Sequence, residues 1–208
     1  MGNNSTARHE HGQHIDYIGK KIGMWFFLFT ELLFFGGMFL LYSVFRYRFP
    51  KGFHEGAMGE NLVIGSINTA VLLTSSLSIA MSISAVKKGN KNLSAMLQVI
   101  TILFGIVFLI DKYFEWMEKI SRGIYPGSPV LLRYGDGELL FFSLYYVMTG
   151  IHGLHVLIGI GVILFMVVFT QREVITKENF SKLENSGLYW HFVDIVWIYL
   201  FPLFYLIT

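Results

Sequence analysis

Glu31 is the acidic residue that stands furthest inside an apolar stretch, GMWFFLFTELLFFGGMFLLY, which begins at Gly23. At 1.5 Å per helical residue it lies about 13 Å from the start of that stretch, nearly half of a hydrocarbon core about 30 Å thick. A carboxyl at this depth is costly and marks a functional position. Two interpretations stay open: a protonation or polar-partner site, or a packing hydrogen bond to a neighbouring helix.

A second group of acids follows a later apolar stretch. Asp111, Glu115 and Glu118 are spaced by four and three residues, so they share one face of a helix. Basic residues stand three or four positions from members of this group, at Lys112, Lys119 and Arg122. The pattern fits a proton-collecting or partner-docking surface, and equally a helix end at the membrane interface that is held by ion pairs.

Two histidine motifs occupy the last two apolar stretches. In GIHGLHVLIG, His152 and His155 are three residues apart, and neighbouring glycines allow close helix packing. In LYWHFVDIVWIYLFP, His191 and Asp194 have the same spacing. Imidazole binds haem or copper, and a His–carboxylate pair can orient a metal ligand. The plainer interpretation is interhelical hydrogen bonding, with His191 and Asp194 as a local hydrogen-bonded pair.

The remaining polar signals are weaker. Asn68 lies in NTAVLLTSSLSIAMS, whose amide and hydroxyl groups are typical of contacts between membrane helices. The N-terminal segment carries three histidines as HEHGQH, which resembles a metal-scavenging tail only loosely: His9, His11 and His14.

Redox centres are hard to place in this chain. There is no cysteine, which excludes disulfides, iron–sulfur clusters, CxxCH haem attachment and thiolate copper sites. The apolar stretches contain three histidines, too few for two haems and a copper, although one bis-histidine haem stays arithmetically open. We expect no metal site and no cofactor in this chain.

The elements that position these residues are predicted to be membrane-spanning helices. Of the 208 residues, 54% are hydrophobic and 14% are charged, against about 25% charged in soluble domains. Five stretches are long enough to span a bilayer, for which about 20 residues are needed. We predict an all-α integral membrane protein: a polar tail (1–21) and one domain (22–208), a bundle of five transmembrane helices at 22–45, 62–86, 93–118, 138–170 and 188–207.

Charge gives an orientation. The tail and the second and fourth connectors share one side of the membrane and hold nine Lys and Arg residues, against six or seven on the other side. The positive-inside rule therefore predicts a cytoplasmic N-terminus and an outside C-terminus. The net charge of +2 is spread over connectors, so no nucleic-acid surface is expected.

Together these residues resemble subunit III of cytochrome c oxidase, in its shorter five-helix bacterial form. The similarity covers all five predicted helices in order. Its most specific stretches are Gly150–Val156 (GIHGLHV) and Tyr189–Trp197 (YWHFVDIVW), joined by Glu31 before Leu-Leu-Phe-Phe, Asn68-Thr69 before Leu-Leu-Thr-Ser, and Glu115-x-x-Glu118.

The resemblance implies an accessory subunit of a haem-copper terminal oxidase in a bacterial cytoplasmic (inner) membrane. Such a subunit binds subunit I alongside subunit II, and the complex can be part of a larger respiratory supercomplex. Haem and copper reside in its partners. It holds phospholipid in a cleft between helices, supports proton uptake and protects the catalytic subunit. Glu31 would correspond to the family's carbodiimide-reactive acid, Glu115 and Glu118 to its paired acids, and His152, His155, His191 and Asp194 to packing positions.

Other functions remain alternatives. Within the family these are subunit III of a quinol oxidase, against which the acid at Glu31 counts mildly, and a homologue associated with nitric oxide reductase. Outside the family, the chain would be an independent b-type cytochrome or a proton transporter. Neither inverted repeats nor broken helices, which would favour a transporter, are evident in the sequence.

Overall fold

The computed structural model describes the backbone of residues 3–206 and the side chains of residues 21–206. This part of the chain is helical and contains no strand. The helices are α1 (Asn3–Arg48), α2 (Pro50–Met58), α3 (Leu62–Lys87), α4 (Lys91–Ser121), α5 (Asp136–Gln171) and α6 (Ser181–Phe201), and α6 continues into a π-helical turn, η2 (Pro202–Leu206).

Five segments of the described chain are long and apolar enough to cross a membrane, which confirms the predicted five-helix fold. They are Lys21–Arg48, Leu62–Lys87, Lys91–Ser121, Asp136–Gln171 and Ser181–Leu206. The bounds differ from the prediction at three places. Helix α1 begins at Asn3 within the expected tail, α6 begins at Ser181 instead of 188, and α2 fills most of an expected connector. Polar residues can continue a helix into water, and hydropathy does not register such extensions.

Helix α2 forms where the sequence suggested only a turn. Pro50 occupies its first turn, a position where the missing N–H costs no hydrogen bond. The chain then turns into α3, whose first turn is capped by Asn61: the Asn61 side chain accepts hydrogen bonds from the backbone N–H of Val63 (3.0 Å) and Ile64 (3.3 Å). Between α3 and α4 the left-handed conformation of Gly89 (φ +78°) closes the short connector.

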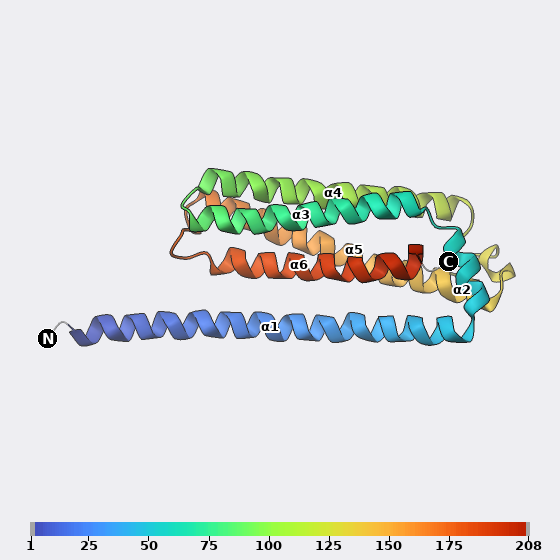
Figure 1. Ribbon diagram of the computed structural model, residues 1–208, viewed down its shortest axis with the longest axis horizontal. Coiled ribbons are helices and arrows are strands. Elements are labelled where there is room, and N and C mark those ends of the chain that lie inside the picture. Colours follow the sequence, from blue (N-terminus) through green and yellow to red (C-terminus); the bar gives the residue numbers. More distant parts are fainter. Residues whose placement is uncertain (1–2, 207–208) are drawn as a thin grey trace.

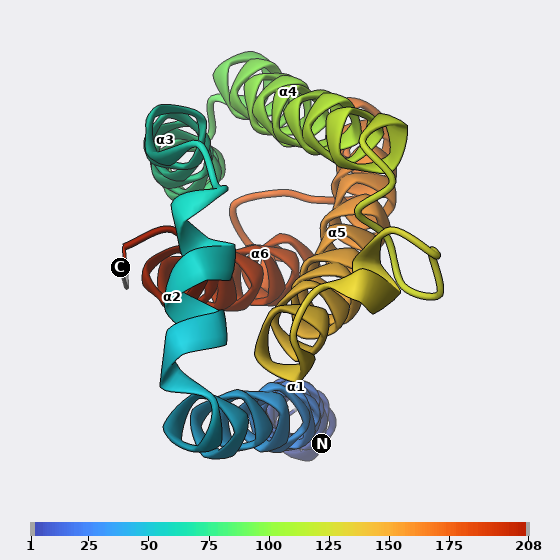
Figure 2. The ribbon, with the colours of Figure 1, turned by 90° about the vertical axis from the view of Figure 1, so that its right-hand side faces the viewer.

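The spanning helices lie nearly parallel, and α1 runs along one side of the group formed by α3, α4, α5 and α6 (Figure 1). Helix α1 projects past the others at the N-terminal end, and the two termini lie at opposite ends of the molecule (Figure 1). Seen from the end where the C-terminus lies, α2 crosses from α1 toward α3 in front of the end of α6 (Figure 2). Helix α2 therefore straps α1 to the rest of the bundle at that end only.

Trp190 of α6 packs at the centre of the four-helix group. It is fully buried, and its indole N–H donates to Ser75 of α3 at 2.7 Å. A Cβ at Gly105 of α4 or at Gly159 of α5 would stand 2.8 Å from its ring. These glycines let the helices approach as closely as the indole requires, which is how small residues act in membrane bundles.

Helix α2 packs against α5 through a close backbone contact, which can be tested by substitution. A Cβ at Gly52 would lie 2.6 Å from the Cα of Gly137, which no side-chain rotation can relieve. We predict that Gly52→Ala destabilises the protein by about 1–3 kcal/mol through overpacking. The midpoint of thermal unfolding in detergent measures it.

Gly36→Ala is the matched control, because a Cβ there meets nothing within 4 Å. It should leave the midpoint unchanged or raise it, since Ala favours helix over Gly by up to about 1 kcal/mol. Equal behaviour of the two variants would show that the Gly52–Gly137 contact is not tight.

Candidate functional site

Glu31 of α1 meets His155 of α5. The Glu31 carboxyl oxygen lies 3.1 Å from His155 Nε2, and both side chains are largely buried. His155 Nδ1 lies 2.8 Å from the backbone carbonyl of Ile151, so Nδ1 carries a hydrogen and donates. The Glu31–His155 contact therefore holds one further proton, either on the carboxyl beside a neutral ring or on the ring beside a carboxylate.

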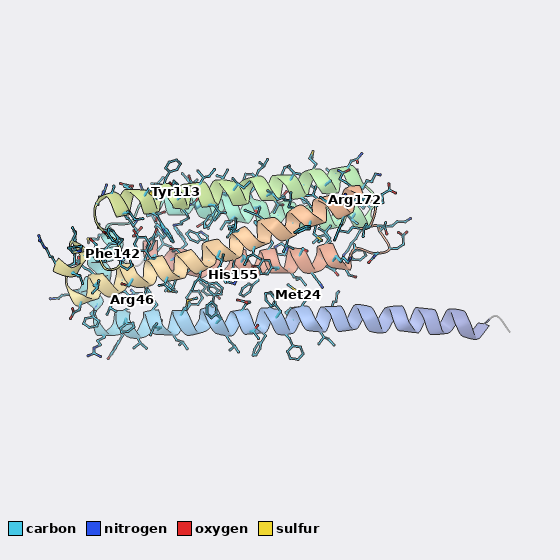
Figure 3. The ribbon with its side chains drawn as sticks, turned by 180° about the vertical axis from the view of Figure 1, so that it is seen from behind. Met24, Arg46, Tyr113, Phe142, His155 and Arg172 are labelled. Atoms are coloured by element: carbon cyan, nitrogen blue, oxygen red, sulfur yellow. The ribbon has the colours of Figure 1, made fainter. Side chains whose placement is uncertain are left out.

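This pair lines a groove of about 460 Å³ between α1, α5 and α6. Figure 3 shows His155 on the side of α5 that faces α1, with Met24 further along α1 toward the N-terminus. The other walls are mainly apolar: Phe27, Ile158, Val162, Asn185, Ser186 and Tyr189. The groove is therefore mainly apolar, with a few polar groups that include the Glu31–His155 pair.

A second cluster lies at the far end of the bundle and is centred on Glu115 of α4. One carboxylate oxygen accepts hydrogen bonds from the hydroxyls of Tyr145 of α5 and Tyr205 of η2, the latter at 2.5 Å. The other oxygen accepts from Lys112 at 2.9 Å. Only 4% of the Glu115 side chain is exposed. Donors from three elements thus replace the water that this carboxylate lost on burial.

The cations of the cluster are also enclosed. The Lys112 ammonium lies 4.6 Å from the ring centroid of Trp197 and 4.9 Å from that of Tyr205, which are cation–π distances. The Lys119 ammonium lies 2.8 Å from Glu60 and 3.4 Å from Glu115, so it bridges the two acids. We call Glu60, Lys112, Glu115 and Lys119 the ion cluster.

Glu60 is the member that the sequence did not single out. It precedes the cap of α3 in a polar connector, and its side chain is fully covered. Burial raises the pKa of Glu60 from 4.5 to about 7, against the opposing effect of the Lys119 ammonium. An acid in a connector is ordinarily solvated, so no sequence signal pointed to Glu60. Its burial follows from packing against segments far away in sequence, such as α4 with Lys119.

The predicted acidic face is divided by the fold. Glu115 is buried in the ion cluster, whereas Glu118 is 59% exposed and pairs with Arg122 at 2.5 Å. The ion-pair interpretation therefore describes Glu118, and for Glu115 it omits the tyrosine hydroxyls, which come from segments far away in sequence.

The histidines of the two motifs contact different helices. His152 is fully buried between the rings of Phe108 and Trp197, with centroids 5.5 and 5.3 Å away. His155 faces α1, and His191 faces α3, where its Nδ1 lies 2.6 Å from the Ser76 hydroxyl. Three rings that face three helices do not converge on one axial-ligand position, so this arrangement disfavours a bis-histidine haem.

The predicted hydrogen bond between His191 and Asp194 is wrong, because His191 bonds to Ser76 of α3 instead. The Ser76 hydroxyl faces both side chains but has hydrogen-bond geometry only to His191. The Asp194 carboxyl is buried without a hydrogen-bond partner in the described part of the chain, and so are Asn68 and His152. The Asp194 carboxyl therefore faces the Ser76 hydroxyl of α3 and makes no hydrogen bond to His191, which lies three residues before it on α6.

Within residues 21–206, no three His, Cys, Asp or Glu side chains gather as a metal site. His9, His11 and His14 lie outside the described side chains.

Comparison with known proteins gives one consistent family. The profile of the family described as "Cytochrome c oxidase subunit III" matches residues 1–208. The chain is 34% identical to "Cytochrome c oxidase subunit 3" of Thermostichus vulcanus, over 100% of this chain and 96% of that protein. It is 32% identical to "Probable quinol oxidase subunit 3" of Staphylococcus haemolyticus, over 90% and 89%. It is also 29% identical to "Heme-copper oxidase subunit I+III" of Aeropyrum pernix, over 94% of this chain and 24% of that protein.

The burial of the ion cluster predicts how much stability is lost when one of its acids is neutralised. Glu115→Gln removes the charge that balances Lys112 in the interior and should destabilise the fold by about 3–5 kcal/mol. Glu118→Gln is the matched control on the same helix and should cost less than about 1 kcal/mol, because its ion pair is exposed. Thermal unfolding of both variants in detergent measures the difference, and similar midpoints would contradict the buried network.

Proposed function

Because the chain belongs to the cytochrome c oxidase subunit III family, we propose that it is the non-catalytic subunit III of a bacterial haem-copper terminal oxidase. It binds the catalytic subunit I beside subunit II, and those partners carry the haem and copper. The observation that carries the proposal is the family match over the whole chain, and the histidine geometry agrees with a role in packing.

A fused relative supports the partnership with subunit I. "Heme-copper oxidase subunit I+III" joins two subunits in one chain, and the region similar to this chain makes up 24% of it. Subunits that are fused in one organism are held together in a fixed ratio, so their separate counterparts are expected to bind each other.

The groove beside Glu31 is the proposed lipid site. Its apolar walls accommodate an acyl chain, and the Glu31–His155 pair offers a polar contact part-way down. A phospholipid seated there would fill the space that α1 leaves against α5 and α6. Such a lipid would act as packing material between this chain and the surrounding bilayer.

Glu31 is also placed to support proton uptake. It follows Lys21 by ten residues and precedes Arg48 by seventeen, so it lies about 15 Å from the N-terminal end of the span. With the N-terminus in the cytoplasm, as the charge bias favours, Glu31 lies in the cytoplasmic half of the membrane. That is the side from which a terminal oxidase takes its protons.

We propose cytochrome c as the electron donor of the complex, with a quinol oxidase as the second candidate. Relatives of both descriptions match this chain at similar identity. The deciding observation is the companion subunit II: a dinuclear-copper ligand set there indicates cytochrome c, and its absence indicates a quinol.

The subunit assignment predicts a purification result. An affinity tag on this chain in its native membrane should bring down subunits I and II together with stoichiometric haem, whereas the chain expressed alone should show no haem absorption. Optical spectra and mass spectrometry of both preparations measure this. A pigmented, active chain without companions would overturn the assignment.

Glu31→Gln tests the role of the pair. The glutamine amide can still donate to His155 Nε2, so the oxidase should assemble in normal yield. Because the variant cannot exchange a proton, O₂ consumption should fall more steeply than in the wild type as the cytoplasmic pH rises. A complex that fails to assemble would show instead that the charge of Glu31 is structural.

A further inference from the structure

The ion cluster lies directly under a second groove, of about 470 Å³, at the end of the bundle where the C-terminus lies. Glu60, Asn61, Glu115, Lys119 and Arg122 all contribute to its walls. The Glu60 side chain has no exposed area, although the residue is part of the groove wall. The groove therefore reaches the wall that holds this buried acid.

The two acids of the cluster are held very unequally. Glu115 accepts hydrogen bonds from four donors: Tyr145, Tyr205, Lys112 and, at 3.4 Å, Lys119. Glu60 has the Lys119 ammonium beside one oxygen, and neither of its oxygens has a donor with hydrogen-bond geometry in the described part of the chain. Hydrogen bonds to the charged form stabilise it, so a proton that enters the cluster binds to Glu60 and not to Glu115.

The charged and titratable groups near Glu60 come from three elements and one helix end. Helix α4 contributes Lys112, Glu115 and Lys119; α5 contributes Tyr145 and Tyr146; η2 contributes Tyr205. Glu118 and Arg122, at the end of α4, line the same groove as Glu60 and pair with each other. With both acids ionised, the two lysines and two glutamates of the cluster sum to zero. One added proton leaves a single positive charge, which Lys119 can carry toward Glu115, 3.4 Å away.

We propose that Glu60 is a proton-binding site at this end of the bundle, which takes a proton from water in the groove and releases it there. On protonation an O–H bond forms on the Glu60 carboxyl, and the Lys119 ammonium, which bridges both acids in the structure, is left paired with the Glu115 carboxylate alone. On deprotonation the Glu60 carboxylate pairs with Lys119 again. The pKa of about 7 places this exchange at physiological pH.

This site is distinct from the Glu31–His155 pair. Glu60 precedes α3 at the end of the molecule where the C-terminus lies, whereas Glu31 lies nearer the other end of the span Lys21–Arg48, ten residues after Lys21. In the proposed orientation, Glu60 exchanges its proton with the outer side of the membrane. Proton binding at Glu60 is a property of this chain alone and does not depend on the proposed function.

A direct titration tests the proposal. The full-length chain, labelled with ¹³C-glutamate and placed in lipid nanodiscs, is titrated by infrared difference spectroscopy between about pH 4 and pH 9. Comparison of the wild type with Glu60→Gln should isolate one carboxyl with a midpoint near 7. Glu55→Gln, which removes an exposed acid of α2, is the matched control and should keep that titration.

Two outcomes would overturn the proposal. One is a Glu60→Gln spectrum that titrates like the wild type. The other is a Glu60 midpoint near 4, the value of an ordinary exposed carboxyl. The readout needs no oxidase turnover, so failure here leaves the subunit assignment intact.

Two further measurements keep the test decisive if Glu60→Gln folds poorly. Lys119→Gln removes the neighbouring cation and should move the midpoint up by roughly one pH unit or more, and an unmoved midpoint would contradict the pairing of Lys119 with Glu60. In addition, a carboxyl whose pKa rises from 4.5 to about 7 on folding stabilises the wild type fully below pH 4.5 and loses that contribution as pH rises through 7. The wild-type melting temperature should fall over this window.

Discussion

A carboxylate inside a helix bundle must recover the hydrogen bonds that it gave up to water, and in this protein Glu115 does so with donors from α4, α5 and η2. That requirement ties together segments that are up to 90 residues apart in sequence. Burying a charge costs solvation free energy, so a buried ion pair contributes little net stability, but removing one partner of such a pair is costly. The ion cluster therefore acts as a specificity device, because only the correct arrangement of α4, α5 and η2 satisfies Glu115, Lys112 and Lys119 together.

The sequence was sufficient for the spanning helices and for Glu31, since both follow from hydropathy and depth in the membrane. It was insufficient wherever a partner comes from another helix. The contact of Glu31 with His155 spans 124 residues, and that of Ser76 with His191 spans 115. Helical spacing placed His191 beside Asp194, yet the ring turns to α3. Glu60 was missed because an acid in a connector carries no signal of burial, and its partner Lys119 comes from α4, 59 residues further along the chain.

The Glu31–His155 pair and the ion cluster lie toward different ends of the bundle, and α1 is attached differently at its two ends. At its C-terminal end α1 is held firmly: the Tyr42 hydroxyl donates to the Leu203 carbonyl, and its ring meets Phe53 and Phe204 at centroid distances of 5.2 Å. At the other end, a partly exposed ion pair joins Lys21 to Glu184 at 3.3 Å. Exposed pairs contribute about 0–1 kcal/mol, so buried ring packing such as that around Tyr42 is expected to hold α1 more strongly than this pair does.

The groove beside Glu31 lies between these two contacts, where α1 faces α5 and α6. Leu28 is buried on this part of α1, and the rings of Phe27 and Tyr189 join α1 to α6 with centroids 6.0 Å apart. The groove beside Glu60 lies at the other end of the bundle, and its wall includes the charged residues Glu118, Lys119 and Arg122. The Glu31–His155 pair therefore lies in a mainly apolar groove between helices, whereas the buried acid Glu60 lies beside a polar groove, so the fold gives these two acids different surroundings.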